Sequence, residues 1–196
     1  RRQRQMCIRD RDKAGTSPTI LFVGRLSAEK HIEDIIEAIA KTDPALDLRA
    51  EIIGAGEQER VLADLADKLG VADRVVLRGK VSDAELVAAY QRADIFCMPS
   101  TAELQSIATL EALATGVPVV LADAVALPHL CEDGVNGRLI APRDIDGYAR
   151  AFTEIATAPL DEREAMSLAA QKIAARHDIS ATLDTFEEIY SGCLQN

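Results

Sequence analysis

The sequence predicts an α/β fold, a Rossmann-like parallel sheet of about six strands with helices on both faces. Short apolar runs rich in β-branched residues alternate with segments whose apolar residues recur every three or four positions. The runs are continuously apolar, as expected of strands that are covered on both faces. Strands that alternate with helices across short loops are typical of parallel strands joined by right-handed crossovers.

The expected elements follow one another regularly from residue 18 onward. Each strand is a short apolar run, and the first four are each followed by a helical stripe such as Ile32, Ile35, Ile36 and Ile39. After residue 121 the pattern is helical in three successive segments. We therefore expect an open sheet followed by two or three helices. The expected strands are 19–23, 48–53, 75–77, 95–98 and 117–121, and the late helical segments are 148–155, 161–176 and 179–190.

Charge and composition exclude several classes of function. The chain of 196 residues carries a formal net charge of −10, which argues against a nucleic-acid partner and against a general attraction to anionic lipid. The four cysteines form no CxxC pair, which indicates reduced thiols in a cytoplasmic protein. No run of 18 apolar residues is present, so no membrane span is expected.

The first residues differ from the rest of the chain. The stretch RRQRQMCIRDRDK contains five Arg and one Lys against two Asp and has no periodic apolar pattern. The string RQRQMCIRDR is similar to translated sequencing-adapter sequence. We therefore expect residues 1–16 to be a non-native or disordered leader.

The loop after the first expected strand, VGRLSAEKH (23–31), offers two cations. In open parallel sheets ligands bind beyond the carboxyl ends of the strands. Gly24 ends the strand where a side chain would block a close approach, Arg25 follows, and Lys30 is expected to open the next helix. A cation is unfavourable at a helix N-terminus, and an anion bound between Arg25 and Lys30 would remove this conflict. The alternative is a solvated Lys30 beside Glu29.

The next two loops carry weaker signals. IIGAGEQE (52–59) has a GxG after a strand but lacks the third glycine of a dinucleotide fingerprint, so it indicates only a tight turn near a nucleotide. In LRGKVSD (77–83), Ser82 or Asp83 is a good N-cap for the following helix.

The stretch TAELQSIATLEALATG (101–116) contains two glutamates, Glu103 and Glu111, with seven residues between them. Glu103 lies in the loop after strand 95–98, the helix is expected to begin near Ser106, and Glu111 lies inside it. Helix N-terminal amides can receive a phosphate, and carboxylates accept well from sugar hydroxyls. The pattern indicates a diphosphate flanked by a ribose and a transferable sugar. The alternative is that Glu111 simply lies on the solvated face of its helix.

These motifs together resemble the donor-binding half of a retaining glycosyltransferase of family 4, with the GT-B architecture, over about residues 18–160. The resemblance rests on FVGRLSAEKH, on the loop stretches quoted above and on the later DGVNGRLIAP turn. It implies that Arg25 and Lys30 bind the diphosphate, that Glu111 holds the ribose, and that Glu103 contacts hydroxyls of the donor sugar. It also implies that Val81 and Asp83 lie near the base, largely through backbone, and that Gly134, Asn136 and Gly137 form a structural turn.

One departure from the family pattern concerns the distal phosphate. Many members have Phe-Gly after the first glutamate, whereas this chain has Leu104-Gln105-Ser106-Ile107. The amide of Ser106 or Ile107 is still available to the phosphate. The segment resembles a subgroup of lipid and cell-envelope glycosyltransferases, which hints at such an acceptor.

The resemblance also implies a domain organisation and a reaction. Residues 17–160 would bind the nucleoside diphosphate sugar, and helices in 161–196 would pack back toward an N-terminal GT-B domain that binds the acceptor and is missing here. The reaction would move a hexosyl unit with retention, without a cofactor or a metal. We expect a cytoplasmic location, compatible with work at the inner face of the membrane. As an isolated fragment the chain is expected to be inactive.

Three other functions are considered for the same sequence. A Rossmann oxidoreductase would need GxGxxG after the first strand, where this chain has GRLSAEK. A non-catalytic nucleotide-sugar-binding module would bind the donor without transferring it. A GT-B glycan or sucrose-type synthase is the third alternative; a related phosphorylase would carry a pyridoxal-binding lysine motif, which is not seen in this sequence.

Overall fold

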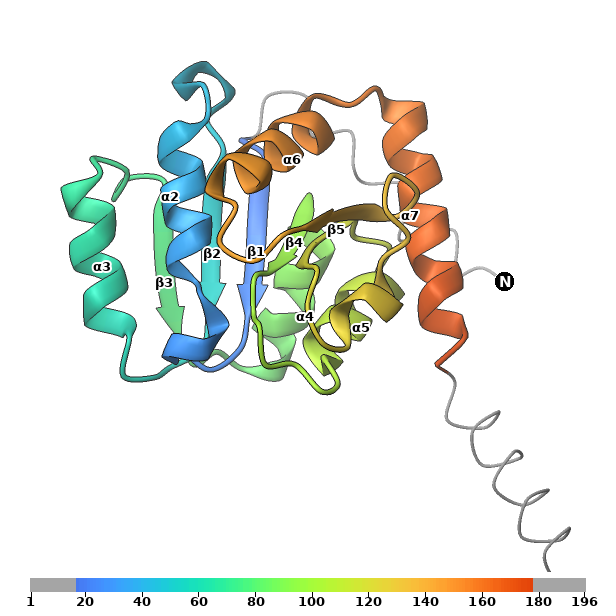
Figure 1. Ribbon diagram of the computed structural model, residues 1–196, viewed down its shortest axis with the longest axis horizontal. Coiled ribbons are helices and arrows are strands. Elements are labelled where there is room, and N and C mark those ends of the chain that lie inside the picture. Colours follow the sequence, from blue (N-terminus) through green and yellow to red (C-terminus); the bar gives the residue numbers. More distant parts are fainter. Residues whose placement is uncertain (1–16, 178–196) are drawn as a thin grey trace, which may run out of the picture.

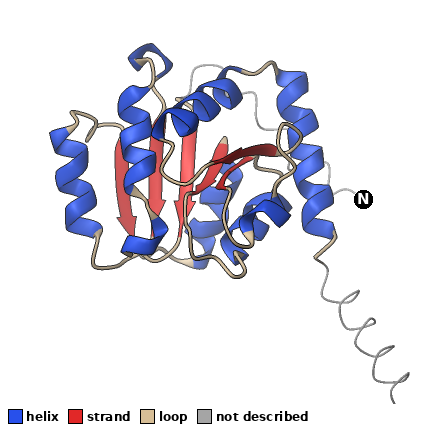
Figure 2. Cartoon of the chain, in the orientation of Figure 1, coloured by secondary structure: helices blue, strands red, loops and turns tan. Residues whose placement is uncertain are grey.

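The structure is a computed structural model that describes residues 17–177. The expected leader, residues 1–16, and the helix expected over 179–190 lie outside the described residues. Six parallel strands form one sheet in the order β3-β2-β1-β4-β5-β6, with helices on both faces (Figures 1 and 2). The predicted fold class is confirmed. The strands are β1 (Thr19–Val23), β2 (Arg49–Ile53), β3 (Val75–Gly79), β4 (Ile95–Met98), β5 (Val119–Ala122) and β6 (Gly137–Ile140).

The strand order determines which helices cover which face. Strands β2 and β3 are added on one side of β1, while β4, β5 and β6 are added on the other. Right-handed crossovers then place α2 and α3 on one face and α4 and α5 on the opposite face. The chain returns to the first face with α6, which packs against α2, and α7 packs against α5. The helices are α2 (Glu33–Lys41), α3 (Glu59–Lys68), α4 (Asp83–Arg92), α5 (Ile107–Ala114), α6 (Ile145–Thr157) and α7 (Leu160–Ala175).

The strand bounds agree closely with the sequence pattern, except at one edge. Strands 19–23 and 95–98 match residue by residue, and β4 and β5 are buried along their whole length. The sixth strand, β6, had not been located from the sequence. It is the short run GRLI, whose glycine lets β6 approach β5 closely, since a Cβ at Gly137 would lie 1.8 Å from the Val119 carbonyl oxygen. Such a strand carries little apolar signal.

Three short 3₁₀ helices complete the described secondary structure: η1 (Ala28–Lys30), η2 (Pro44–Leu46) and η3 (Leu127–Leu130). In the described part of the chain, no helix has the length and apolar character needed to cross a membrane.

One carboxylate lies inside the otherwise aliphatic core. Asp34, in the first turn of α2, is fully buried, and its Oδ1 pairs with the guanidinium of Arg143. Within residues 17–177, its Oδ2 has no hydrogen-bond partner. Burial raises the pKa of Asp34 to about 6, while the nearby Arg143 acts to lower it and Glu33 acts to raise it. Asp34 is therefore a charge that the fold holds in an unfavourable environment at neutral pH.

Candidate functional site

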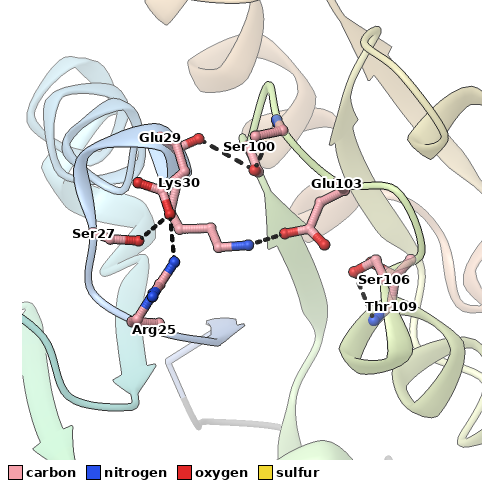
Figure 3. Close-up of polar contacts among 9 residues, drawn as sticks. Arg25, Ser27, Glu29, Lys30, Ser100, Glu103, Ser106 and Thr109 are labelled. Carbon is pink, nitrogen blue, oxygen red and sulfur yellow. Dashed lines mark hydrogen bonds and ion pairs between the residues drawn. The ribbon is translucent and has the colours of Figure 1, made fainter.

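The candidate site lies where the strand order reverses, beyond the carboxyl ends of the adjacent strands β1 and β4. The loops after these two strands lie side by side (Figure 3). The main-chain oxygen of Glu29 accepts hydrogen bonds from Ser100 Oγ at 3.2 Å and from the Thr101 amide at 3.3 Å. Doubly wound sheets bind ligands at this kind of reversal, because the flanking helices leave the sheet on opposite faces there.

Lys30 and Glu103 bring the two loops together at their side chains. The Lys30 ammonium points at the Glu103 carboxylate and forms an ion pair with it (Figure 3). The Lys30 side chain is 17% exposed and that of Glu103 is 10% exposed. Two of the residues predicted from the sequence are therefore in direct contact, although they are 73 positions apart. Each charge therefore has a partner of opposite sign in this largely buried position.

The prediction that Lys30 opens a helix is wrong. Lys30 is the last residue of the 3₁₀ helix η1, and α2 begins only at Glu33. His31 adopts the left-handed conformation, with φ at 49°, and this ends the short helix. The α2 N-terminus instead carries Glu33 and Asp34, the charges that its dipole favours.

Arg25 occupies a more open position than Lys30. Its side chain is 69% exposed and its Nη2 lies 2.9 Å from Glu29 Oε1. Ser27 Oγ donates to the same oxygen at 2.6 Å, and this bond, together with a backbone hydrogen bond and Arg25, lowers the pKa of Glu29 to about 2. The alternative of Lys30 solvated beside Glu29 is therefore wrong, since Arg25 is the partner of Glu29. An exposed cation of this kind can exchange its partner for a ligand at little cost.

Two glycines of the second loop support the first loop. A Cβ at Gly54, where φ is 142°, would lie 1.8 Å from the Gly24 carbonyl oxygen, and a Cβ at Gly56 would lie 2.1 Å from that of Leu26. The Leu26 amide donates to the Ala55 carbonyl at 3.1 Å across the same contact. The GxG after β2 therefore serves close packing between backbones and fixes the loop that carries Arg25.

The α5 N-terminus follows Glu103 after a short turn. Ser106 is the N-cap, is 2% exposed, and its Oγ accepts hydrogen bonds from the Thr109 amide at 3.4 Å and the Thr109 hydroxyl at 2.7 Å (Figure 3). Ile107 is the first residue of the helix and is 64% exposed. Of the six α-helices within residues 17–177, only α5 has no acidic residue in its first turn. Its first amides have no intrahelical acceptor, so this end can face an anion.

Glu111 lies one turn further along α5 and does not join the Lys30–Glu103 pair. Its Oε2 accepts a hydrogen bond of 2.8 Å from the hydroxyl of Tyr90, near the end of α4. The residue as a whole is exposed. Glu111 is therefore on a solvated surface, as the alternative interpretation has it, but its carboxylate has a fixed orientation.

The residues predicted to lie near a base sit at the start of α4. Val81 is half-buried against the core, and Asp83 is exposed as the first residue of the helix. Ser82, rather than Asp83, is the N-cap, and it forms a capping box with Glu85.

The expected structural turn is present between η3 and β6. Gly134 has φ at 78°, and buried Asn136 holds the turn through bonds to the Glu132 amide at 2.7 Å and the Leu130 carbonyl at 3.1 Å. Gly137 already belongs to β6.

Sequence reasoning did not anticipate the loop after β5 as a neighbour of the site. The Ala126 amide donates to the Glu103 carbonyl at 3.2 Å. Val125, just before it, has φ at 52°, which is a strained conformation for a β-branched residue, and it is 56% exposed. Neither feature has a local sequence signal, because both depend on packing between loops.

Other neighbours were also missed. Ser100, Thr101 and Tyr90 contact site residues through bonds that join distant segments. The Arg25–Glu29 pair, by contrast, joins opposite charges that lie four positions apart in the sequence. Three or more potential metal ligands do not converge anywhere within residues 17–177.

Comparison with known proteins identifies the family. The family described as glycosyl transferases group 1 matches residues 4–173. A D-inositol 3-phosphate glycosyltransferase of Saccharomonospora viridis is 33% identical over 181 residues, which cover 87% of this chain and 42% of that protein. An uncharacterised glycosyltransferase of Methanocaldococcus jannaschii is 38% identical over 130 residues, covering 66% of this chain and 33% of that protein. The chain thus spans less than half the length of these curated relatives.

Solved structures show the same architecture. The Anabaena protein HepE in complex with UDP-glucose superposes with a TM-score of 0.78 at 27% identity, over 97% of this chain and 51% of that one. The catalytic domain of cholesterol-α-glucosyltransferase from Helicobacter pylori gives a TM-score of 0.75 at 25% identity, over 83% of this chain and 100% of that one. The six-stranded parallel sheet with helices on both faces is the Rossmann-like fold of GT-B glycosyltransferases. This chain belongs to the glycosyl transferases group 1 family.

Proposed function

We propose that the chain is the donor-binding part of a retaining, family 4 glycosyltransferase that moves a hexosyl unit from a nucleoside diphosphate sugar. The observation that carries the proposal is the Lys30–Glu103 pair at the reversal of strand order, with exposed Arg25 on one side and the α5 N-terminus on the other. The complex of HepE with UDP-glucose supports a nucleotide sugar as the ligand. The proposed acceptor is a hydroxyl of a lipid or cell-envelope glycan.

In this proposal each group of the site has a distinct role. Lys30, Arg25 and the first amides of α5 bind the diphosphate and stabilise the charge that develops on it as it leaves. Glu103 accepts hydrogen bonds from the transferred sugar, and Glu111 accepts from the ribose. A carboxylate beside Lys30 orients the ammonium between sugar and phosphate, so the same ion pair would position both parts of the donor. Backbone around Val81 and Asp83 would contact the base.

Arg25 provides the sharpest test of the diphosphate role, because its exposure separates binding from folding. Replacement by Ala removes one charge-assisted contact, and we expect a fivefold to tenfold loss of UDP affinity, about 1–1.4 kcal/mol. Uridine affinity should not change, because the nucleoside lacks the diphosphate. Titration calorimetry with UDP, GDP, ADP and the matching nucleosides measures both quantities.

Arg60 provides the matched control for this measurement. It lies on α3, its side chain is 93% exposed, and it pairs with Asp64 at i,i+4 as Arg25 pairs with Glu29. Arg60→Ala removes the same charge and should leave diphosphate affinity unchanged. Equal losses for diphosphate and nucleoside in Arg25→Ala would contradict the assignment.

The transfer reaction itself needs an acceptor hydroxyl held at the anomeric carbon, and such positioning can contribute about 7–11 kcal/mol. We place that function in the part of the full-length protein outside these residues. The 196-residue chain, incubated with labelled donor and lipid or sugar acceptors, is therefore expected to bind without turnover. Turnover of around 1 per second would show that this chain already contains the acceptor site.

A further inference from the structure

The Tyr90–Glu111 hydrogen bond joins α4 to α5 beside the proposed donor site. Tyr90 is 3% exposed, and its ring packs against Phe96 of β4 with the ring centroids 6.1 Å apart. Its hydroxyl reaches Glu111 Oε2 at 2.8 Å. The ring therefore fixes the position of the hydroxyl, and the hydroxyl fixes the carboxylate.

We propose that Tyr90 is a positioning residue for ribose recognition, acting through Glu111. This inference rests on the proposed function, in which Glu111 accepts hydrogen bonds from the ribose. A phenol has a single proton to donate, and here it is given to one oxygen of the carboxylate. An ionised carboxylate can accept about four hydrogen bonds, so Glu111 keeps its other oxygen and further lone pairs for a ligand.

The bond matters because it restrains a side chain that is flexible by nature. Glutamate is flexible, and Glu111 stands on an exposed position of α5. Without Tyr90, a ligand would have to immobilise this side chain as well as bind it. Burial and the bond to Glu111 both raise the pKa of Tyr90, so the phenol stays protonated and remains a donor at neutral pH.

The test uses the 196-residue chain and titration calorimetry. UDP, GDP and ADP are each compared with their 2′,3′-dideoxy counterparts, which lack the hydroxyls that Glu111 would bind. Tyr90→Phe keeps the buried ring and removes only the donor. We expect it to weaken ribonucleoside diphosphate binding about threefold to tenfold and to leave binding of the dideoxy nucleotides unchanged. In a Glu111→Ala background the same substitution should have no further effect, because Tyr90 then has nothing to orient.

Tyr148 provides the matched control. It is also a buried tyrosine, located on α6, and its hydroxyl has no hydrogen-bond partner within the described residues. Tyr148→Phe removes the same atom from the core and should leave every nucleotide affinity unchanged. Thermal unfolding of both variants verifies that the fold is retained.

The outcomes separate this inference from the proposed function. Equal weakening of ribo- and dideoxynucleotides by Tyr90→Phe would overturn the positioning role, as would unchanged affinity for both. If Glu111→Ala binds ribo- and dideoxynucleotides as wild type does, the ribose role of Glu111 fails and the inference fails with it. If wild type binds none of the three diphosphates, the proposed function itself is overturned.

Discussion

Replacing Lys30 by Met tests whether the ion pair at the site also holds the two loops together. The substitution keeps the length of the side chain and removes its charge, which leaves the Glu103 carboxylate, 10% exposed, without a cation. Removing one partner of a fully buried pair costs about 3–5 kcal/mol. Because Lys30 and Glu103 keep some exposure, we expect a loss of about 2–4 kcal/mol. For a domain of this size that lowers Tm by roughly 5–15 °C.

The assay is urea and thermal unfolding without nucleotide, since a bound ligand would add its own stabilisation. Glu103→Gln in the Lys30→Met background removes the remaining charge, so the double variant should return to within about 1 kcal/mol of wild type. Arg25→Ala is the control, because its exposed pair should contribute about 0.5 kcal/mol or less. Wild-type stability in Lys30→Met, or no recovery in the double variant, would refute the reasoning.

Two further predictions concern the scaffold. Because native Asp34 keeps its proton up to about pH 6 while the unfolded chain releases it near 3.8, the stability contributed by this group is complete below pH 4 and is lost as pH rises through 6. Between pH 4 and pH 7, the free energy of unfolding of Asp34→Asn should therefore rise by about 3 kcal/mol relative to that of the wild type. Denaturant titrations at several pH values measure this difference, and a difference that does not change with pH would contradict the prediction. Gly54→Ala should lower the free energy of unfolding by more than about 2 kcal/mol, because its Cβ would lie 1.8 Å from the Gly24 carbonyl oxygen. Gly70 also has a positive φ, 69°, but a Cβ there would meet no atom within 4 Å, so Gly70→Ala should lower it by only about 1 kcal/mol. Equal unfolding midpoints for the two glycine variants would show that the loop contact is not tight.

The fold class could be predicted because its signals are local. Buried parallel strands are continuous apolar runs, and TILFV and IFCM lie in the structure where the sequence placed them. The strand β6 was not located because it is short, lies after a turn and contains Arg138. Its place in the sheet depends on a glycine that accepts close contact with β5, which has no periodic pattern.

The site was predictable as a set of residues but not as a network. Loops at the carboxyl ends of parallel strands must converge, so Lys30 and Glu103 could be placed in the same region from their strand ends alone. The helix start near Lys30 was misplaced because His31 takes a left-handed conformation, which L-residues other than glycine adopt only as single residues set by the surrounding structure. The Tyr90–Glu111 bond spans 21 residues and two helices, and only tertiary packing creates it.

The two hydrogen bonds that the Glu29 carbonyl accepts affect how long a ligand stays bound. Since this oxygen receives bonds from both Ser100 and Thr101, the loops after β1 and β4 behave as a single mechanical unit. A ligand that orders one loop orders the other at the same time, so the conformational entropy of the two loops is lost once and not twice. Dissociation then requires the joined loops to loosen together, and a change in either loop would be felt in the residence time of the ligand.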